Sequence, residues 1–353
     1  MVSIQIIADK AGVSCATVSR AFRNSESVSP STYSKIMQVA KELNYRPKKY
    51  RGHSQNCVYN STIGVIASDL MVSFYPKVIK GISTVARAHG IDVIVCDSND
   101  DPGIEIRNLE LMRTQHVNGI IFSPVADDSE TTTAYMEELK KTRIPIVLLD
   151  RSLKGIGLDG VFRDDFNASV VATQCLIKVG HKYIASLAGT LNSKPGLERL
   201  NGYLSAMQQN GLGTNELVYY CSFRSEPAYQ QTKVLLATHP EVTAIFSCNK
   251  EMTAGCIRAI QDAGLRIPDD IALISYGDLD SSQMYSSILT SVTQPIAPLG
   301  EECSRILIDK IEHGIKRGQA GGRRITFESK LVCRGSEQYP TRTRGKISFP
   351  KED

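Results

Sequence analysis

Apolar residues near the start of the chain recur with the spacing of a short helix. From Ile4 to Ala11 they stand at i, i+3, i+4 and i+7, which places one narrow apolar stripe on a helix. Gly12 follows, and because glycine lacks a Cβ it can adopt the positive φ of a tight turn between two helices. A second helix can begin at once, with Ser14 as its cap. This stretch therefore predicts a pair of short helices joined at a glycine.

The second predicted helix has an apolar face and a small, basic face. Val18, Ala21 and Phe22 share the inward side, whereas the opposite side carries small residues and arginines. Small side chains let a helix approach base edges closely, and an arginine can bind guanine through two hydrogen bonds or neutralise a phosphate. The face is typical of a DNA recognition helix, and it also fits a helical pair whose arginines are merely solvated.

A third helix and a polar linker follow. Ser29-Pro30 places a capping residue before a proline, and helical spacing of apolar residues continues to Leu43. Residues 45–61 are polar and poor in helix formers, so we expect a linker there. Its positive residues fit either contact with a phosphate backbone or minor groove, or a flexible solvated tether; they are Arg46, Lys48, Lys49 and Arg51.

From Thr62 onwards, short β-branched runs alternate with amphipathic helices, which predicts βαβ units. The pattern occurs twice, so we expect two doubly wound lobes that face each other across a cleft. The predicted strands are 62–67, 91–97, 118–123, 144–150, 182–189, 217–222, 243–248, 271–276, 289–294 and 327–334. Polar residues just after these strands can hydrogen-bond the hydroxyls of a sugar or cap the following helices; they include Asp69, Asp97, Ser123, Asp150, Asn249 and Asp278.

The charge of the chain is unevenly distributed. The net charge is +4, yet residues 1–60 hold nine Lys or Arg against three acidic residues. A small basic domain on a nearly neutral body is the electrostatic footprint of a protein that binds nucleic acid. A membrane surface would also attract it, but the narrow apolar faces of the helices suit packing against each other and make lipid binding the weaker hypothesis.

Several classes of protein are disfavoured by the sequence. The chain has no apolar run long enough for a membrane span and no signal-peptide core, so we expect it in the cytoplasm. Its nine cysteines are scattered and its six histidines lack metal-type spacing, so we expect reduced thiols, no metal and no cofactor. A G-x-G-x-x-G match at 155–160 does not open a helix directly after a strand, and no P-loop, nucleophile elbow or H-E-x-x-H motif occurs. We therefore expect no enzyme, and a solute-binding receptor would need an export signal.

The motifs AGVSCATVSR, VSPST, ELNYRP, TIGVI and GHKYIASLAG together resemble the lactose/galactose repressor (LacI) family of bacterial transcription regulators, over nearly the whole chain. The resemblance implies an N-terminal three-helix helix-turn-helix headpiece plus an α/β two-lobed, periplasmic-binding-protein-like body with doubly wound parallel sheets. We accordingly expect a headpiece at 1–46, a hinge at 47–61, a body at 62–338 for effector binding and dimerisation, and a loose basic tail at 339–353. Within the body, lobe 1 is expected at about 62–160 and 292–320, and lobe 2 at about 161–291.

The same resemblance implies a sequence-specific repressor. A homodimer or tetramer would bind a palindromic operator in double-stranded DNA, and a small effector, a sugar or sugar phosphate, would bind between the lobes. Base-reading positions would be Cys15, Ala16 and Arg20, with backbone contacts from Ser14, Thr17, Ser19 and Asn24, further DNA contact at Tyr45, and hinge contacts from Lys48, Lys49 and Arg51. Effector contacts would come from Asp69, Phe74, Tyr75, Asp150, Arg199, Asn249, Lys250, Asp278 and Gln294, with Phe74 and Tyr75 stacking. The alternative role for Arg199 is a salt bridge with Glu198 or a helix neighbour.

Three departures from the family pattern bear on these expectations. The linker reads PKKYRGHS and lacks the leucine that wedges into the minor groove, which puts a hinge helix in doubt. Gly277 stands where the first aspartate of G-[FY]-D-D is usual, so one sugar contact is missing. Lys250 replaces a usual aspartate, which suggests an anionic ligand or a cleft that no longer binds a simple sugar, unless Lys250 is solvated in the first helical turn. The remaining alternative is an orphan regulator whose degenerate cleft serves dimerisation or a protein partner.

Overall fold

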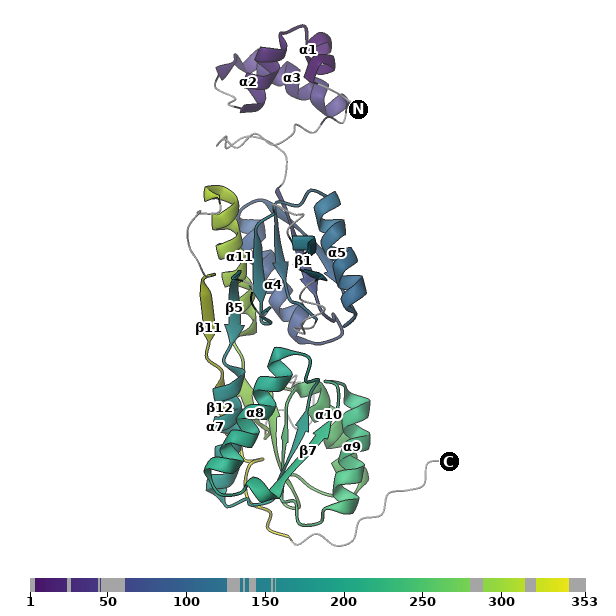
Figure 1. The fold of residues 1–353 in the computed structure, drawn as a ribbon, viewed down its shortest axis with the longest axis vertical. Coiled ribbons are helices and arrows are strands. Elements are labelled where there is room, and N and C mark those ends of the chain that lie inside the picture. The colour runs from purple at the N-terminus through teal and green to yellow at the C-terminus, as the bar shows by residue number, and fades with distance from the viewer. Residues whose placement is uncertain are drawn as a thin grey trace, which may run out of the picture. The chain divides into compact units, whose positions relative to one another are not determined.

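The computed structural model divides the chain into two units, Met1–Asn60 and Ser61–Asp353 (Figure 1). The structure describes residues 4–23, 27–43, 45, 61–125, 134–135, 137–139, 144–153, 155, 157–279, 288–314 and 322–342. The expected hinge therefore lies outside the described residues, apart from its last residue, Ser61, which begins a strand. Among the helices described, none is both long and apolar enough to cross a bilayer.

The first unit contains the three helices that the sequence predicts. They are α1 (Ile4–Ala11), α2 (Cys15–Arg23) and α3 (Pro30–Glu42), and they share one small core. Gly12 adopts a φ of 64°, and the next residue, Val13, donates its N–H to the carbonyl of Ala8 at 3.0 Å, which closes the end of α1. Ser14 caps α2, because its Oγ accepts the N–H of Thr17 at 3.1 Å. The helix-turn-helix fold is thus confirmed.

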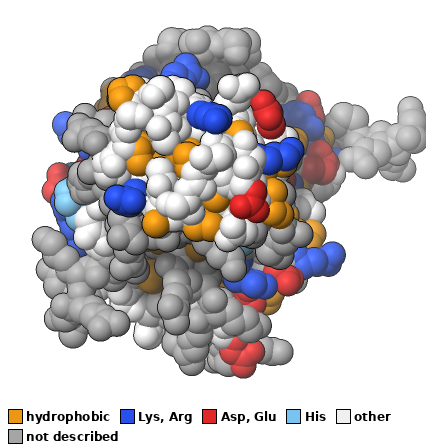
Figure 2. Space-filling view, turned by 90° about the horizontal axis from the view of Figure 1, so that it is seen from above, with side chains coloured by type: hydrophobic (Ala, Val, Ile, Leu, Met, Phe, Trp, Pro, Cys, Tyr) orange, Lys and Arg blue, Asp and Glu red, His pale blue; other side chains and the backbone are white. Residues whose placement is uncertain are grey.

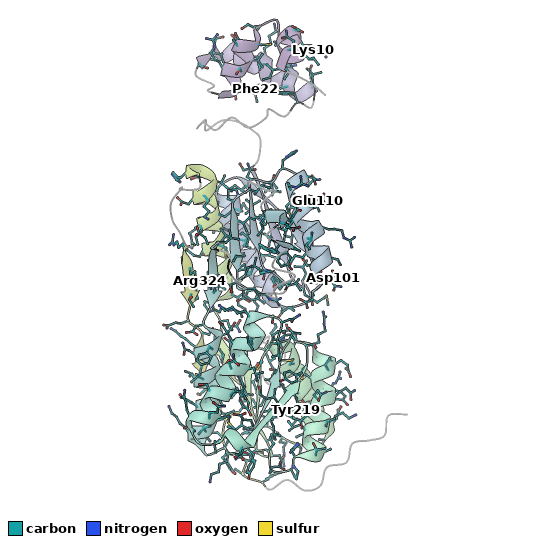
Figure 3. All side chains as sticks on the ribbon, in the orientation of Figure 1. Lys10, Phe22, Asp101, Glu110, Tyr219 and Arg324 are labelled. Carbon is teal, nitrogen blue, oxygen red and sulfur yellow. The ribbon has the colours of Figure 1, made fainter. Side chains whose placement is uncertain are left out.

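The first lobe of the body is a parallel sheet in the order β11-β5-β4-β3-β1-β2. Alternate residues of its central strands enter two apolar cores, one beneath α4 (Phe74–Ala88) and α11 (Ile296–His313), the other beneath α5 (Pro102–Thr114). Figure 3 shows Asp101 where α5 begins; its side chain accepts the N–H groups of Gly103 and Ile104. The strands are β1 (Ser61–Ala67), β2 (Ile91–Asp97), β3 (Gly119–Phe122), β4 (Ile146–Leu149), β5 (Asp159–Arg163) and β11 (Arg324–Phe327).

The second lobe repeats the design with strand order β12-β10-β9-β8-β6-β7. Its edge strand β12 runs antiparallel to β10, and the other pairs are parallel. Helix α7 (Asp165–Val179) packs with α8 (Lys194–Gln209), and α9 (Ser225–Thr238) packs with α10 (Lys250–Asp262) on the other side of the sheet (Figure 1). The strands are β6 (Ile184–Ala188), β7 (Glu216–Tyr220), β8 (Ala244–Ser247), β9 (Ala272–Tyr276), β10 (Thr290–Thr293) and β12 (Lys330–Val332), and a short 3-10 turn spans Gly213–Asn215.

The chain passes between the two sheets three times within the described residues: after β5, after β10 and after β11. These passages change the expected lobe limits. Strand β5, which the sequence analysis did not predict, continues the first lobe to residue 163, and β10 keeps residues 292–293 in the second lobe. The stretch 327–334, expected as one strand, holds the end of β11 and all of β12, which lie in different sheets (Figure 1).

Two further predicted segments are the helix near 129–141 and the C-terminal tail. The helix expected near 129–141 falls mostly outside the described residues. Tyr339, placed in a loose tail, instead stacks on the ring of His181 with centroids 4.9 Å apart, and the N–H of Arg342 donates to the carbonyl of Asp269 at 3.1 Å. The ordered C-terminal segment therefore extends at least to residue 342, and the rest of the tail lies outside the described residues.

Candidate functional site

The outward face of α2 is the candidate DNA-binding surface. Val18 and Ala21 are buried in the headpiece core, whereas Ala16 and Arg20 are exposed. The Arg20 Nε donates to the carbonyl of Ala16 at 3.4 Å, so the guanidinium lies along the helix surface. In the space-filling view, basic side chains lie interspersed with acidic and hydrophobic ones (Figure 2). Within the headpiece, the face predicted from the sequence therefore presents Ala16 and Arg20 at the surface.

The other expected DNA contacts have local roles in the headpiece. Ser14 and Thr17 join their hydroxyls at 2.8 Å, which supports the N-terminal cap of α2. The Cys15 Sγ donates to Gln5 Oε1 at 3.0 Å and so links α2 to α1. The ring of Tyr45 packs on Phe22 with centroids 5.8 Å apart. Ser19 is half-buried on α2. Of the remaining expected contacts, Asn24, Lys48, Lys49 and Arg51 lie outside the described residues.

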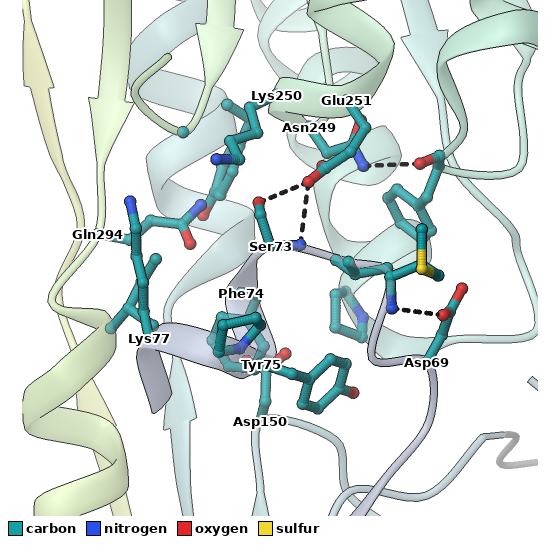
Figure 4. A pocket seen from close by; sticks show the side chains of 18 of the residues that line it. Asp69, Ser73, Phe74, Tyr75, Lys77, Asp150, Asn249, Lys250, Glu251 and Gln294 are labelled. Carbon is teal, nitrogen blue, oxygen red and sulfur yellow. Dashed lines mark hydrogen bonds between the residues drawn. The ribbon is translucent and has the colours of Figure 1, made fainter. Parts of the chain in front are cut away.

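A cavity of about 940 Å³ lies between the lobes of the body (Figure 4). Every residue expected to contact an effector lines it, and these residues come from strand ends and helix starts in both lobes; they are Asp69, Phe74, Tyr75, Asp150, Arg199, Asn249, Lys250, Asp278 and Gln294. Two other strand-end candidates, Asp97 and Ser123, instead hold the backbone of Leu70 and the hydroxyl of Tyr75. The volume suits a small molecule the size of a sugar.

A buried ion pair occupies the floor of this cavity. Asp150 directly follows β4, and Arg163 ends β5 and binds both carboxylate oxygens, with Nε to Oδ1 at 2.6 Å and Nη2 to Oδ2 at 2.5 Å. The Arg163 Nη1 donates to Gln294, which follows β10. The guanidinium carbon also lies 4.5 Å from the centroid of the Phe74 ring. One arginine therefore joins three of the expected effector contacts.

A second buried arginine organises the other wall. The Arg199 Nε donates to Asp165 at 3.1 Å, its Nη1 donates to the Cys248 carbonyl at 2.7 Å, and its guanidinium lies 4.0 Å from the Tyr276 ring centroid. Burial opposes the ionisation of Asp165, but Arg199 and Arg163 hold its pKa below the ordinary value. Of the two salt-bridge partners suggested from the sequence, a helix neighbour is present, namely Asp165 on α7, whereas Glu198 pairs with Lys194 at 3.3 Å.

Two expected effector contacts also have structural roles. Asn249 caps α10 by accepting the N–H of Met252 at 2.7 Å, and its amide donates to the Phe223 carbonyl at 3.0 Å (Figure 4). Asp278 accepts from Thr293 at 3.2 Å and from Arg334 at 3.0 Å, as well as from Ser291. Although burial opposes ionisation, these hydrogen bonds hold the pKa of Asp278 below its ordinary value.

Polar contacts join the lobes across the cavity. The Arg224 Nη2, from the second lobe, donates to Asp69 Oδ2 of the first lobe at 2.7 Å. Ser73, at the N-cap position of α4, makes no capping hydrogen bond; instead it donates its backbone N–H to Glu251 Oε1 at 3.1 Å and its hydroxyl to the same oxygen at 2.5 Å (Figure 4). Neither Arg224 nor Glu251 was predicted from the sequence. Because each contact bridges two lobes, a change in the angle between the lobes must break or lengthen it.

The aromatic and basic residues shape the rest of the lining. Tyr75 is anchored by hydrogen bonds between its hydroxyl and those of Ser68 at 2.7 Å and Ser123 at 2.9 Å, so only part of its ring faces the cavity. Lys77, Lys80 and Lys250 add positive charge to the lining. Figure 4 shows Lys77 and Lys250 on the same side as Gln294. Gly277, in place of an aspartate, has a φ of 106° and leaves this side without that carboxylate.

A buried carboxylate lies behind the first-lobe wall. Arg151, which lines the cavity, donates to the Val125 carbonyl at 2.9 Å, and the N–H of Val125 donates to Glu105 on α5 at 3.0 Å. The hydroxyl of Tyr135 donates to the same carboxylate. Burial raises the pKa of Glu105 to about 7. This group was not predicted, because Glu105 stands in the first turn of a helix, where acidic residues are usually solvated.

Comparisons with known proteins agree with this architecture. The family model of periplasmic binding proteins and sugar binding domain of the LacI family matches residues 60–333, and that of bacterial regulatory proteins, lacI family, matches residues 3–48. Catabolite control protein A of Priestia megaterium is 32% identical over 309 residues, 87% of this chain and 91% of that protein.

Solved structures with the same two units are also similar. The lac repressor dimer bound to operator and the anti-inducer ONPF has a TM-score of 0.71 at 25% identity, covering 96% of this chain and 99% of that one. The complex of the transcriptional regulator CelR with cellobiose has a TM-score of 0.67 at 27% identity, covering 95% of this chain and 100% of that one. The similarity extends over the helix-turn-helix unit and the two-lobed body together.

Proposed function

The chain belongs to the LacI family of bacterial regulatory proteins, and from this premise we propose that it is a DNA-binding transcriptional repressor controlled by a small effector, not an enzyme. A homodimer or dimer of dimers would place two copies of α2 in successive major grooves of a palindromic operator. One observation carries the proposal: a helix with a small, basic outward face and a cavity lined by all the expected effector contacts occur in one chain.

The cavity chemistry supports a sugar or a sugar phosphate as the effector. Carboxylates and amides around the cavity can exchange hydrogen bonds with hydroxyl groups, and Phe74 offers an apolar ring edge. Asp69 and Asp150 are already bound by arginines, so their negative charge is balanced within the protein. The lining also carries three lysines, Lys77, Lys80 and Lys250, and these are the residues that a phosphate ester would approach.

The effector would act through the contacts that join the lobes. A ligand can shift an equilibrium between open and closed lobes only by binding one state more tightly. The ion pair of Arg224 with Asp69 and the hydrogen bonds of Ser73 with Glu251 exist in the arrangement of the lobes seen here. A ligand that replaces or strengthens them would change the preferred angle between the lobes, and with it the spacing of paired headpieces.

Internal pairing in the cavity also favours a second candidate, an orphan regulator. Asp150, Asn249 and Asp278 each have partners within the protein, so the cavity needs no ligand to satisfy them. Such a protein would repress without a small effector and would respond to a protein partner or to none.

Two titrations separate these functions. Full-length protein is titrated against labelled duplexes from its own genomic neighbourhood and against random duplex at physiological salt; a regulator should prefer a fragment containing an inverted repeat. Melting temperature is then followed with monosaccharides, disaccharides and sugar phosphates, where a ligand at one hundred times its dissociation constant contributes about 2.7 kcal/mol. No preference among duplexes would contradict the regulator, whereas operator binding with no thermal shift for any ligand would favour the orphan.

A further inference from the structure

Two cysteines of the second lobe lie with their sulfur atoms in contact. Cys175 belongs to α7 and Cys333 directly follows β12, and their Sγ atoms are 3.8 Å apart although 158 positions separate them in the chain. Both are free thiols in this structure. We propose that Cys175 and Cys333 form a reversible disulfide on exposure to a peroxide, which makes this face of the second lobe a thiol modification site.

The surrounding structure holds the two residues ready for this bond. Helix α7 packs against β12 and β10, so both cysteines sit on elements of the same lobe. The sulfur separation of 3.8 Å exceeds the length of a disulfide bond by about 1.8 Å, a distance that a small rotation of each side chain can close. The two sulfur atoms are therefore already neighbours in the folded lobe.

Exposure assigns different roles to the two thiols. Cys333 is exposed and Cys175 is half-buried. Burial, followed by the neighbouring Cys333, raises the pKa of Cys175 to about 12, so this thiol is protonated at neutral pH and does not react first. Cys333 is the residue that meets the oxidant, and Cys175 is the residue that resolves the product.

The chemistry balances with one molecule of hydrogen peroxide. The Cys333 thiolate attacks a peroxide oxygen and breaks the O–O bond, which gives a sulfenic acid and a hydroxide that takes the proton lost by the thiol. The Cys175 sulfur then attacks the Cys333 sulfur, and the departing hydroxide leaves as water with the Cys175 proton. Two thiols are oxidised to one disulfide, the peroxide is reduced by two electrons, and two water molecules form.

The bond would act on a segment that supports the cavity. Arg334 follows Cys333 and donates to Asp278, which lines the cavity, and to the carbonyl of Leu289 at 2.9 Å. A disulfide at Cys333 attaches the segment after β12 to α7. This segment follows the passage of the chain from the first lobe (β11) to the second lobe (β12). It also closes a long loop in the unfolded chain, so the oxidised protein should melt at a higher temperature.

The test treats reduced full-length protein with a small excess of hydrogen peroxide, blocks the remaining thiols, and maps peptides by mass spectrometry. We expect a linked peptide containing Cys175 and Cys333, the early loss of two thiols per chain, and a rise in melting temperature that dithiothreitol reverses. Cys333→Ser should remove the linked peptide and slow the first thiol loss about tenfold. Cys175→Ser should leave a sulfenic acid at Cys333 that dimedone traps, and the control Cys96→Ser, a half-buried thiol on β2, should behave as wild type.

Three results would overturn the proposal. The first is oxidation of Cys333 in the wild-type protein to a sulfinic acid without the linked peptide. The second is an equal rate of thiol loss in the wild type and Cys333→Ser. The third is a melting temperature that does not change when the linked peptide is present. Because the peptide map and the melting shift are both measured on the wild type, they decide the question even where a serine variant fails to fold.

Discussion

The ion pair of Arg163 with Asp150 gives the sharpest test of how the cavity is built. Arg163→Met keeps a long apolar stem but removes the guanidinium, and the Asp150 carboxylate then loses both of its short hydrogen bonds from this residue. The two side chains are only 5% and 4% exposed, so the carboxylate left behind has little access to solvent. Removing one partner of a buried pair costs about 3 to 5 kcal/mol. We expect the free energy of unfolding at pH 7 to fall by that amount.

A double-mutant cycle isolates the pair from other effects of the substitution. Asp150 has a φ of 63°, and asparagine tolerates this backbone conformation, so Asp150→Asn changes charge without straining the chain. The double variant buries no unpaired charge and should be more stable than Arg163→Met alone by about 2 kcal/mol. Arg258→Met is the matched control, because its ion pair with Glu226 is exposed, and it should leave stability almost unchanged.

The assay is urea unfolding followed by far-UV circular dichroism, since the chain has no tryptophan to report by fluorescence. If Arg163→Met lies within about 1 kcal/mol of wild type, the carboxylate of Asp150 must be hydrated when its partner is gone. Water in the cavity would then reach the Asp150 carboxylate, and the stability loss expected from its burial would be wrong.

Three more predictions concern the DNA surface, the cavity and the buried carboxylate. Arg20→Ala should weaken operator binding by about 1 to 3 kcal/mol and relax specificity, whereas unchanged affinity in an anisotropy titration would argue against base reading by Arg20. Arg199→Ala should abolish the effector response while operator binding persists, and it should lower the melting temperature because Asp165 loses its ion-pair partner; a normal response would exclude Arg199 from the effector contacts. Burial raises the pKa of Glu105 from 4.5 to about 7, so the folded chain binds more protons than the unfolded chain between these values and stability falls as pH rises through this window. Glu105→Gln should remove about 3 kcal/mol of that fall, measured from urea midpoints at pH 5 and pH 8; an unchanged pH dependence would show that Glu105 ionises freely.

Periodicity predicted the folds of both units because their apolar faces must be buried. The alternation of strands and helices after Thr62 indicates two lobes, and strand-end residues such as Asp69 and Asp150 must then gather at one edge of each sheet. The cavity lining confirms that placement. Contact between these residues and an effector stays a prediction. The partners that they have within the protein were not predicted from the sequence and are seen only in the structure.

The pairing of side chains was not visible in the sequence. Arg163 ends a short strand, β5, that contains Gly160 and lacks a clear alternation, so neither the strand nor its arginine was predicted. Arg224 and Asp69 are separated by 155 positions, and Cys175 and Cys333 by 158, and no local pattern links residues so far apart. Periodicity reports which face a residue occupies, but the partner of a polar group depends on the three-dimensional register of separate elements.

Strands β11 and β12 are adjacent in the chain, yet each forms an outer edge of a different sheet. A premature stop codon before residue 324 would therefore strip one strand from both halves of the body at once, and neither half corresponds to an uninterrupted piece of the gene. During synthesis, both sheets must wait for the same late segment to leave the ribosome before they can be completed.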